Sequence, residues 1–182
     1  MGVMAAARRR SLAQNLRDMV LSMVVVVLIC LVVVAVAGRA QPTPTTRVDY
    51  QPVLIRARAA ADFPVLAPVV SPADWTPTSA RYEPLPDLPG VPVWQVGWVT
   101  AGEQYVGLSQ ARTTDRRFLA ERTRDGRRVG VVTLGSTAWE RWENAEAGER
   151  SLVCTTDGVT TVVTGTVDWT VLEPFATSLQ GG

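Results

Sequence analysis

"RSLVCTTDGVTTVVTG", residues 150–165, contains two runs rich in β-branched side chains on either side of the dipeptide Asp157-Gly158. An Asp-Gly pair between two such runs is a strong signal for a tight β-hairpin, because both central positions of the favoured turn need a positive φ. The stretch therefore predicts two antiparallel strands joined by a two-residue turn.

A second hairpin is predicted upstream of the first. "VWQVGWVT" (residues 93–100) and "YVGLSQA" (residues 105–111) flank the short connection "AGEQ". Trp94, Val96 and Trp98 share one face of the first run, and this period of two is the pattern of a pleated strand. The two runs are expected to pair as neighbouring strands.

Three short helices are predicted outside the hairpins. The first, at 52–62, is rich in alanine, has Pro52 in its first turn and follows Asp49, which can cap it. The second is a basic helix at 116–124. The third follows Asp168, and two alternatives stay open for it: the helix starts near residue 173 after a tight turn, or it bends at Pro174.

Two further strands complete the pattern. Residues 76–84 are expected to form a strand that leads into a proline-rich loop at 84–92, and residues 127–135 another that follows the turn at Asp125-Gly126. Consecutive hairpins with helices outside them indicate an α+β fold. We therefore expect an antiparallel sheet of about six strands, in two hairpin units, flanked by short helices.

A long apolar segment precedes this predicted domain. Residues 19–37, "MVLSMVVVVLICLVVVAVA", contain Ser22 as their only polar side chain. About nineteen helical residues at roughly 1.5 Å each nearly cross a hydrocarbon core of about 30 Å. Signal-peptide cores usually have only about 7–15 residues, which favours a retained transmembrane helix. The alternative is cleavage, since Ala35-Val36-Ala37 has the small-x-small pattern of a signal-peptidase site.

The arginines near this segment predict its orientation. Four arginines lie in residues 1–18, whereas only Arg39 and Arg47 closely follow the segment. The positive-inside rule therefore places residues 1–18 in the cytoplasm. Residues 38–48 are then an extended stalk, and residues 49–182 form an extracytoplasmic domain. The predicted localisation is the cell membrane, crossed once.

Composition excludes several classes of function. The chain has no His and no Lys, which removes the Ser-His-Asp triad, imidazole zinc sites, Schiff-base lysines and the Walker A loop. A net charge of +1 gives no excess for binding nucleic acid. Cys30 lies within the apolar segment and Cys154 lies far along the chain in the predicted domain, so the two are not expected to form a disulfide. Cys154 is expected to be a small buried residue. The alternative for Cys154 is an intermolecular disulfide or a reactive thiol. We predict no catalytic, cofactor-binding or metal-binding residues.

Six residues are candidates for a binding surface. Aromatic rings can stack on sugars or anchor a partner, and arginines can meet anionic lipids or phosphate-bearing polymers. The alternatives are core filling for the aromatic residues and a solvated helix for the arginines. The candidates are Trp94, Trp98, Trp139, Trp142, Arg116 and Arg117.

Several segments between residues 16 and 179 together resemble an actinobacterial family of single-span membrane proteins known only as a domain of unknown function. They are "LRDMVLSMVVV", "ARAAADFPVLAP", "WTPTSARYEP", "WQVGWVTAGEQYVGLSQA" and "LVCTTDGVTTVVTGTVDWTVLEPFATSL". The resemblance implies a cell-membrane protein with one extracytoplasmic domain, and it implies no activity.

The sequence favours a non-enzymatic module of the cell envelope, anchored in the lipid bilayer, that binds an envelope protein or polymer. One alternative is a carboxylate-dependent enzyme acting on cell-wall glycans, with Glu140 and Glu143 as its acids. Another alternative is a carrier of an apolar ligand, which requires an internal apolar cavity of several hundred Å³.

Overall fold

The computed structural model describes residues 19, 20, 23–28, 30, 47–69, 72–86 and 88–181. The chain divides into two units, residues 1–44 and 45–182. In the first unit the described residues are helical. No helix among the described residues is both long and apolar enough to cross a membrane. Residues 1–18, much of the predicted span at 19–37 and most of the predicted stalk at 38–48 lie outside the described residues.

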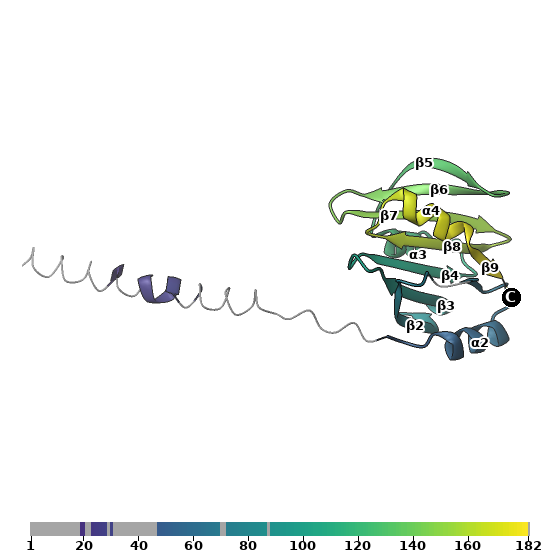
Figure 1. Cartoon of the computed structure of the whole chain (residues 1–182), viewed down its shortest axis with the longest axis horizontal. Coiled ribbons are helices and arrows are strands. Elements are labelled where there is room, and N and C mark those ends of the chain that lie inside the picture. Colours follow the sequence, from purple (N-terminus) through teal and green to yellow (C-terminus); the bar gives the residue numbers. More distant parts are fainter. Residues whose placement is uncertain are drawn as a thin grey trace, which may run out of the picture. The chain divides into compact units, whose positions relative to one another are not determined.

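The second unit is built on a seven-stranded antiparallel sheet in the order β2-β3-β4-β8-β7-β6-β5 (Figure 1). Two meanders, β2 to β4 and β5 to β8, meet where β4 pairs with β8. The strands are β2 (Thr76–Leu85), β3 (Leu88–Val99), β4 (Tyr105–Ala111), β5 (Arg127–Leu134), β6 (Thr137–Asn144), β7 (Glu149–Thr156) and β8 (Val159–Gly165).

Three helices accompany this sheet: α2 (Gln51–Ala60), α3 (Arg116–Thr123) and α4 (Trp169–Thr177). The prediction of an α+β fold with an antiparallel sheet is confirmed. The two alternatives for the last helix are also resolved, because α4 begins directly after Asp168 and continues through Pro174. A start near residue 173 is therefore wrong.

The predicted hairpin at Asp157-Gly158 is present. Asp157 has a φ of 52° and Gly158 a φ of 76°, and Thr156 pairs with Val159 across the turn. Both central residues thus adopt the left-handed conformation that this turn requires.

Two predictions about strands were wrong. The strand β6 was not among the predicted strands, because its acids and arginine mask the strand pattern; its Glu140 pairs with Arg128 of the neighbouring strand at 3.1 Å. The expected loop at 84–92 is mostly paired, with Pro84 opposite Pro92. These prolines are tolerated because β2 is an edge strand and β3 pairs with β4 only from Trp94 onward.

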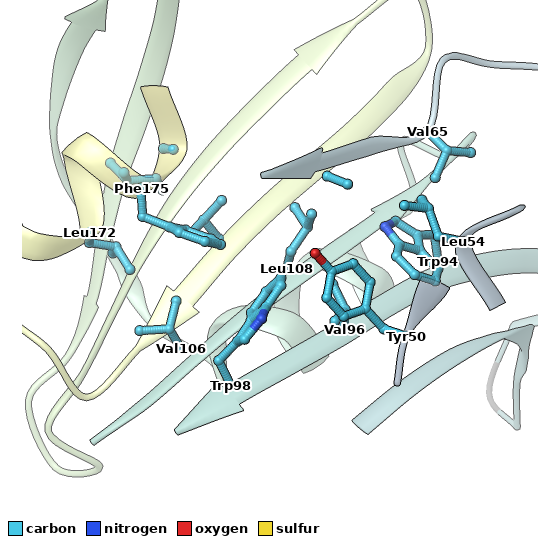
Figure 2. Close-up of a cluster of buried hydrophobic side chains, with 14 of the residues drawn as sticks. Tyr50, Leu54, Val65, Trp94, Val96, Trp98, Val106, Leu108, Leu172 and Phe175 are labelled. Carbon is cyan, nitrogen blue, oxygen red and sulfur yellow. The ribbon is translucent and has the colours of Figure 1, made fainter. Parts of the chain in front are cut away.

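The core has two layers, one on each face of the sheet. The larger cluster includes Trp94, Val96 and Trp98, which share one face as predicted, and the segments around α2 and α4 pack against it (Figure 2). On the opposite face, Phe118 of α3 packs with Val162 of β8. Both faces of the central strands are therefore covered.

Charged contacts fix α4 on its face of the sheet. Arg141 of β6 pairs with Glu173 and lies over the ring of Trp169, 5.3 Å from the ring centroid. Arg150 of β7 reaches the carboxylate of Asp168 at 3.2 Å. These contacts hold the start and the middle of α4 against β6 and β7.

Gly165 is expected to be the least replaceable glycine in the sheet. It pairs with Val106 on one side and Arg150 on the other, and a Cβ atom there would lie 2.7 Å from the carbonyl oxygen of Tyr105. We expect Gly165→Ala to lower the free energy of unfolding by about 1–3 kcal/mol, measured by urea denaturation. Gly130→Ala is the matched control, since a Cβ there meets no atom within 4 Å. Equal losses for both variants would contradict this prediction.

Candidate functional site

A cavity of about 550 Å³ opens on the face of the sheet that carries the larger core cluster. Its volume lies within the range of about 300–1,000 Å³ that is usual for small-molecule sites. The lining comes from the sheet, from the end of α4 and from two short strands, and includes Leu66, Gln110, Leu134, Trp139, Val159 and Leu179.

The two short strands form a strap, defined here as residues 64–68 and 179–181. They are β1 (Leu66–Pro68) and β9 (Leu179–Gly181), and they pair antiparallel with Leu66 opposite Gly181. The strap therefore joins the segment after α2 to the C-terminal end of the chain, along one side of the cavity.

Two buried side chains of the main sheet bind the strap. Gln110 of β4 is only 4% exposed; its Oε1 accepts a hydrogen bond from the Leu66 amide at 2.9 Å, and its Nε2 donates to the Pro64 carbonyl at 3.1 Å. The indole Nε1 of Trp94 donates to the Leu66 carbonyl at 2.9 Å. The strap's backbone groups are thus satisfied by side chains rather than by a long strand ladder.

Arg112 lies at the rim of the cavity, and all three nitrogens of its guanidinium contact protein oxygens. Its Nε is 2.7 Å from the Asp62 carboxylate, and its two terminal nitrogens donate to the carbonyls of Asp62 and Asp157. Its guanidinium also lies 6.0 Å from the centroid of the Phe63 ring. Arg112 therefore links the segment after α2 with the β7–β8 turn, and its charge is already balanced by the protein.

The remaining lining mixes apolar and hydroxyl-bearing side chains. Trp139 and Val159 are almost completely buried beside the hydroxyl of Thr161. Cys154 is an unpaired, half-buried thiol whose Sγ lies 3.5 Å from Thr156 Oγ1. Such a lining fits a molecule with an apolar body and a few hydrogen-bonding groups.

Four tryptophans were predicted as candidates for a binding surface, and the structure separates them. Trp94 and Trp98 are completely buried in the core, so the surface interpretation is wrong for them and the core alternative is correct. Trp139 lines the cavity. Trp142 lies on the opposite face, near the cluster around α3, and its indole donates to the carboxylate of Glu140 at 3.0 Å.

The two candidate arginines lie on α3, away from the lining of the cavity. Arg116 and Arg117 are exposed, and Arg117 pairs with Asp115 at 2.7 Å. Hydrogen bonds from Arg117 to this carboxylate hold the pKa of Asp115 below its usual value. Asp115 also caps α3, because its carboxylate accepts a hydrogen bond from the Arg117 amide. Asp115 and Arg117 therefore stabilise the N-terminal end of this helix.

The two candidate acids of a glycan enzyme do not face each other. Side chains alternate between the faces of a strand, so residues 140 and 143 of β6 point to opposite sides of the sheet. Glu140 pairs with Arg128, and Glu143 pairs with Arg150 at 3.4 Å. Among the residues that the structure describes, no group of three or more Cys, Asp or Glu side chains could hold a metal ion.

Sequence reasoning missed Gln110 and Arg112, although one signal for them existed. Gln110 shares a strand face with Val106 and Leu108, which lie in the core, and Arg112 directly follows the end of this strand. A polar residue that continues the buried side of a strand needs a buried partner, and this requirement could have marked Gln110 as structurally special.

Comparisons with known proteins identify a family and several distantly similar solved structures. A family described as "Protein of unknown function (DUF4245)" matches residues 11–179. No curated protein matches the chain. A crystal structure of MucB in complex with MucA(peri) shows 21% identity and a TM-score of 0.36, and the MucA/MucB complex of Pseudomonas aeruginosa shows 19% and 0.35. Each similarity covers 64% of this chain but only 36% and 34% of those chains.

Proposed function

This chain belongs to the DUF4245 family, whose function is unknown, and we propose that it is a membrane-anchored, non-enzymatic binding module of the cell envelope. The observation that carries this proposal is the cavity of about 550 Å³ beside the strap. The volume reaches the size that the carrier alternative requires, but the cavity is open and its lining is mixed rather than apolar. The opposed directions of Glu140 and Glu143 count against the glycan enzyme.

The proposed anchor is the apolar segment at residues 19–37. Its length and its single polar side chain support a helix across the bilayer, and the four arginines before it support a cytoplasmic N-terminus. Residues 38–48 would then be the stalk, and residues 49–182 the extracytoplasmic domain. The family resemblance supports an actinobacterial cell envelope as its setting.

The proposed ligand is a small amphipathic molecule with an apolar chain. Leu134, Val159 and Leu179 offer apolar contacts, and the hydroxyl of Thr161 offers a hydrogen bond. Arg112 is already paired with Asp62, so the site has no spare cation to select a strongly anionic ligand. A cavity of this kind favours a small molecule over a polymer chain as the envelope component that is bound.

Photolabelling of the full chain in phosphatidylcholine nanodiscs tests this proposal. We expect a neutral palmitoylglycerol probe that carries a diazirine on its acyl chain to form adducts, among residues 47–181, mainly on the cavity lining near Trp139 and Val159. Cys154→Phe should place a ring in the cavity and displace part of the acyl chain of the probe. Each excluded methylene costs roughly 0.8 kcal/mol, so losing two lowers the affinity roughly tenfold.

Cys154→Ser is the matched control, because it changes the same residue without filling the cavity, and it should label like the unchanged protein. Adducts scattered evenly over the domain, or equal labelling of the phenylalanine and serine variants, would contradict a ligand site in this cavity. Adducts on residues 19–37 are expected in every sample and do not count.

A further inference from the structure

The outer face of α2 carries an apolar stripe. Leu54 and Ala57 pack into the core, whereas Ile55 is 67% exposed, one of the highest values for a large apolar residue in the second unit. Pro52 and Ala59 are also exposed and lie near Ile55 at helical spacing. Nothing within the described part of the domain covers this stripe.

Arginines flank the stripe on both sides. Arg56 and Arg58 are exposed, and Arg47 is exposed shortly before the helix. Among the described residues, no acidic side chain forms an ion pair with any of these three. An exposed isoleucine between unpaired cations is compatible with contact to a membrane interface, where the apolar side chain and the arginines would both find partners.

The charge of the chain changes sign just beyond this helix. Residues 39–60 contain four arginines and one acid, whereas residues 61–182 contain ten arginines and fifteen acids. Arg56 and Arg58, farther from the proposed span than Arg39 and Arg47, do not contribute to its orientation and can serve another role. Attraction to anionic lipid headgroups is such a role, and it requires the cations to lie next to the bilayer.

Given the proposed anchor at residues 19–37, the covalent connection limits the distance between α2 and the bilayer. Thirteen residues separate Ala37 from Gln51, and their fully extended length is at most about 45 Å. One isoleucine and two or three arginines bind a membrane weakly by themselves, but a short tether makes the contact intramolecular and raises its population.

We propose that the outer face of α2 docks on an anionic phospholipid bilayer, with Ile55 inserted among the headgroups and Arg56 and Arg58 paired with lipid phosphates. This docking rests on the proposed anchor. It has a consequence for the cavity: Phe63 and Pro64, which line it, follow α2 after two residues, so its rim would be held near the lipid.

Spin labelling of the full chain in nanodiscs tests the docking. A nitroxide replaces Ile55 on a background without Cys30 and Cys154, and collisions with oxygen and with a nickel chelate report its depth. In discs of phosphatidylcholine with phosphatidylglycerol, we expect the label to be shielded from nickel at a depth of about 5–10 Å. Arg56→Gln and Arg58→Gln should each lower the ratio of docked to free molecules roughly fivefold.

A label at Val131 is the matched control, since that side chain is 53% exposed on β5 and should stay accessible to nickel. A label at position 55 that is as accessible as the control, in chains that co-elute with discs, overturns the docking and leaves the anchor intact. Chains that fail to co-elute overturn both. Equal shielding in discs of phosphatidylcholine alone overturns the pairing of the arginines with anionic lipid.

Discussion

Trp98→Ala is expected to lower the free energy of unfolding of the domain by about 3–5 kcal/mol. Trp98 is completely buried, and its ring contacts Phe175 of α4 and Tyr50 before α2 edge-on, with centroid separations of 5.1 and 5.9 Å (Figure 2). One side chain therefore joins the sheet to both elements on this face. Urea denaturation followed by circular dichroism measures the loss without relying on tryptophan fluorescence.

Trp98→Phe separates packing from hydrogen bonding. The indole Nε1 of Trp98 is buried without a hydrogen-bond partner, so phenylalanine removes an unsatisfied donor while it keeps most of the ring. We expect this variant to lose clearly less stability than Trp98→Ala. An alanine variant within about 1 kcal/mol of the unchanged protein would show that this cluster is not the centre of the core.

Most of the sheet could be predicted from local patterns. The Asp157-Gly158 turn and the alternation of Trp94, Val96 and Trp98 are signals that span a few residues, and the structure confirms them. The strand β6 was missed because its charged residues are satisfied by partners on neighbouring strands, as when Glu143 pairs with Arg150. Such pairing is invisible until the strand order is known.

The candidate site could not be predicted for the same reason. The strap consists of two three-residue strands from distant parts of the chain, and Gln110 reaches the Leu66 amide across 44 positions. Strands of this length have no periodicity to detect. The sequence also placed Trp94 and Trp98 on one face correctly, but it could not show that α4 and the strap cover that face.

The second large effect is expected from Gln110→Leu, which removes the side chain that holds the strap. Gln110→Leu keeps the approximate volume of the side chain but leaves the Leu66 amide and the Pro64 carbonyl without their partners. Each unsatisfied buried group costs roughly 1–3 kcal/mol, so either the whole domain loses about 2–6 kcal/mol or the strap detaches and regains its hydrogen bonds from water. We expect detachment, because β1 and β9 are short and lie beside a cavity that water can enter.

Hydrogen exchange and thiol modification distinguish these two results. Detachment should speed exchange of the Leu66 amide while the amides of β4 and β8 stay protected, and on a Cys30→Ser background it should speed alkylation of Cys154, which lines the same cavity. Trp94→Phe is the matched variant, since it removes the single bond to the Leu66 carbonyl and should loosen the strap less. If Gln110→Leu destabilises every strand equally and leaves Cys154 no more reactive than before, the strap is an integral part of the core. The cavity would then have to admit its ligand elsewhere along the rim.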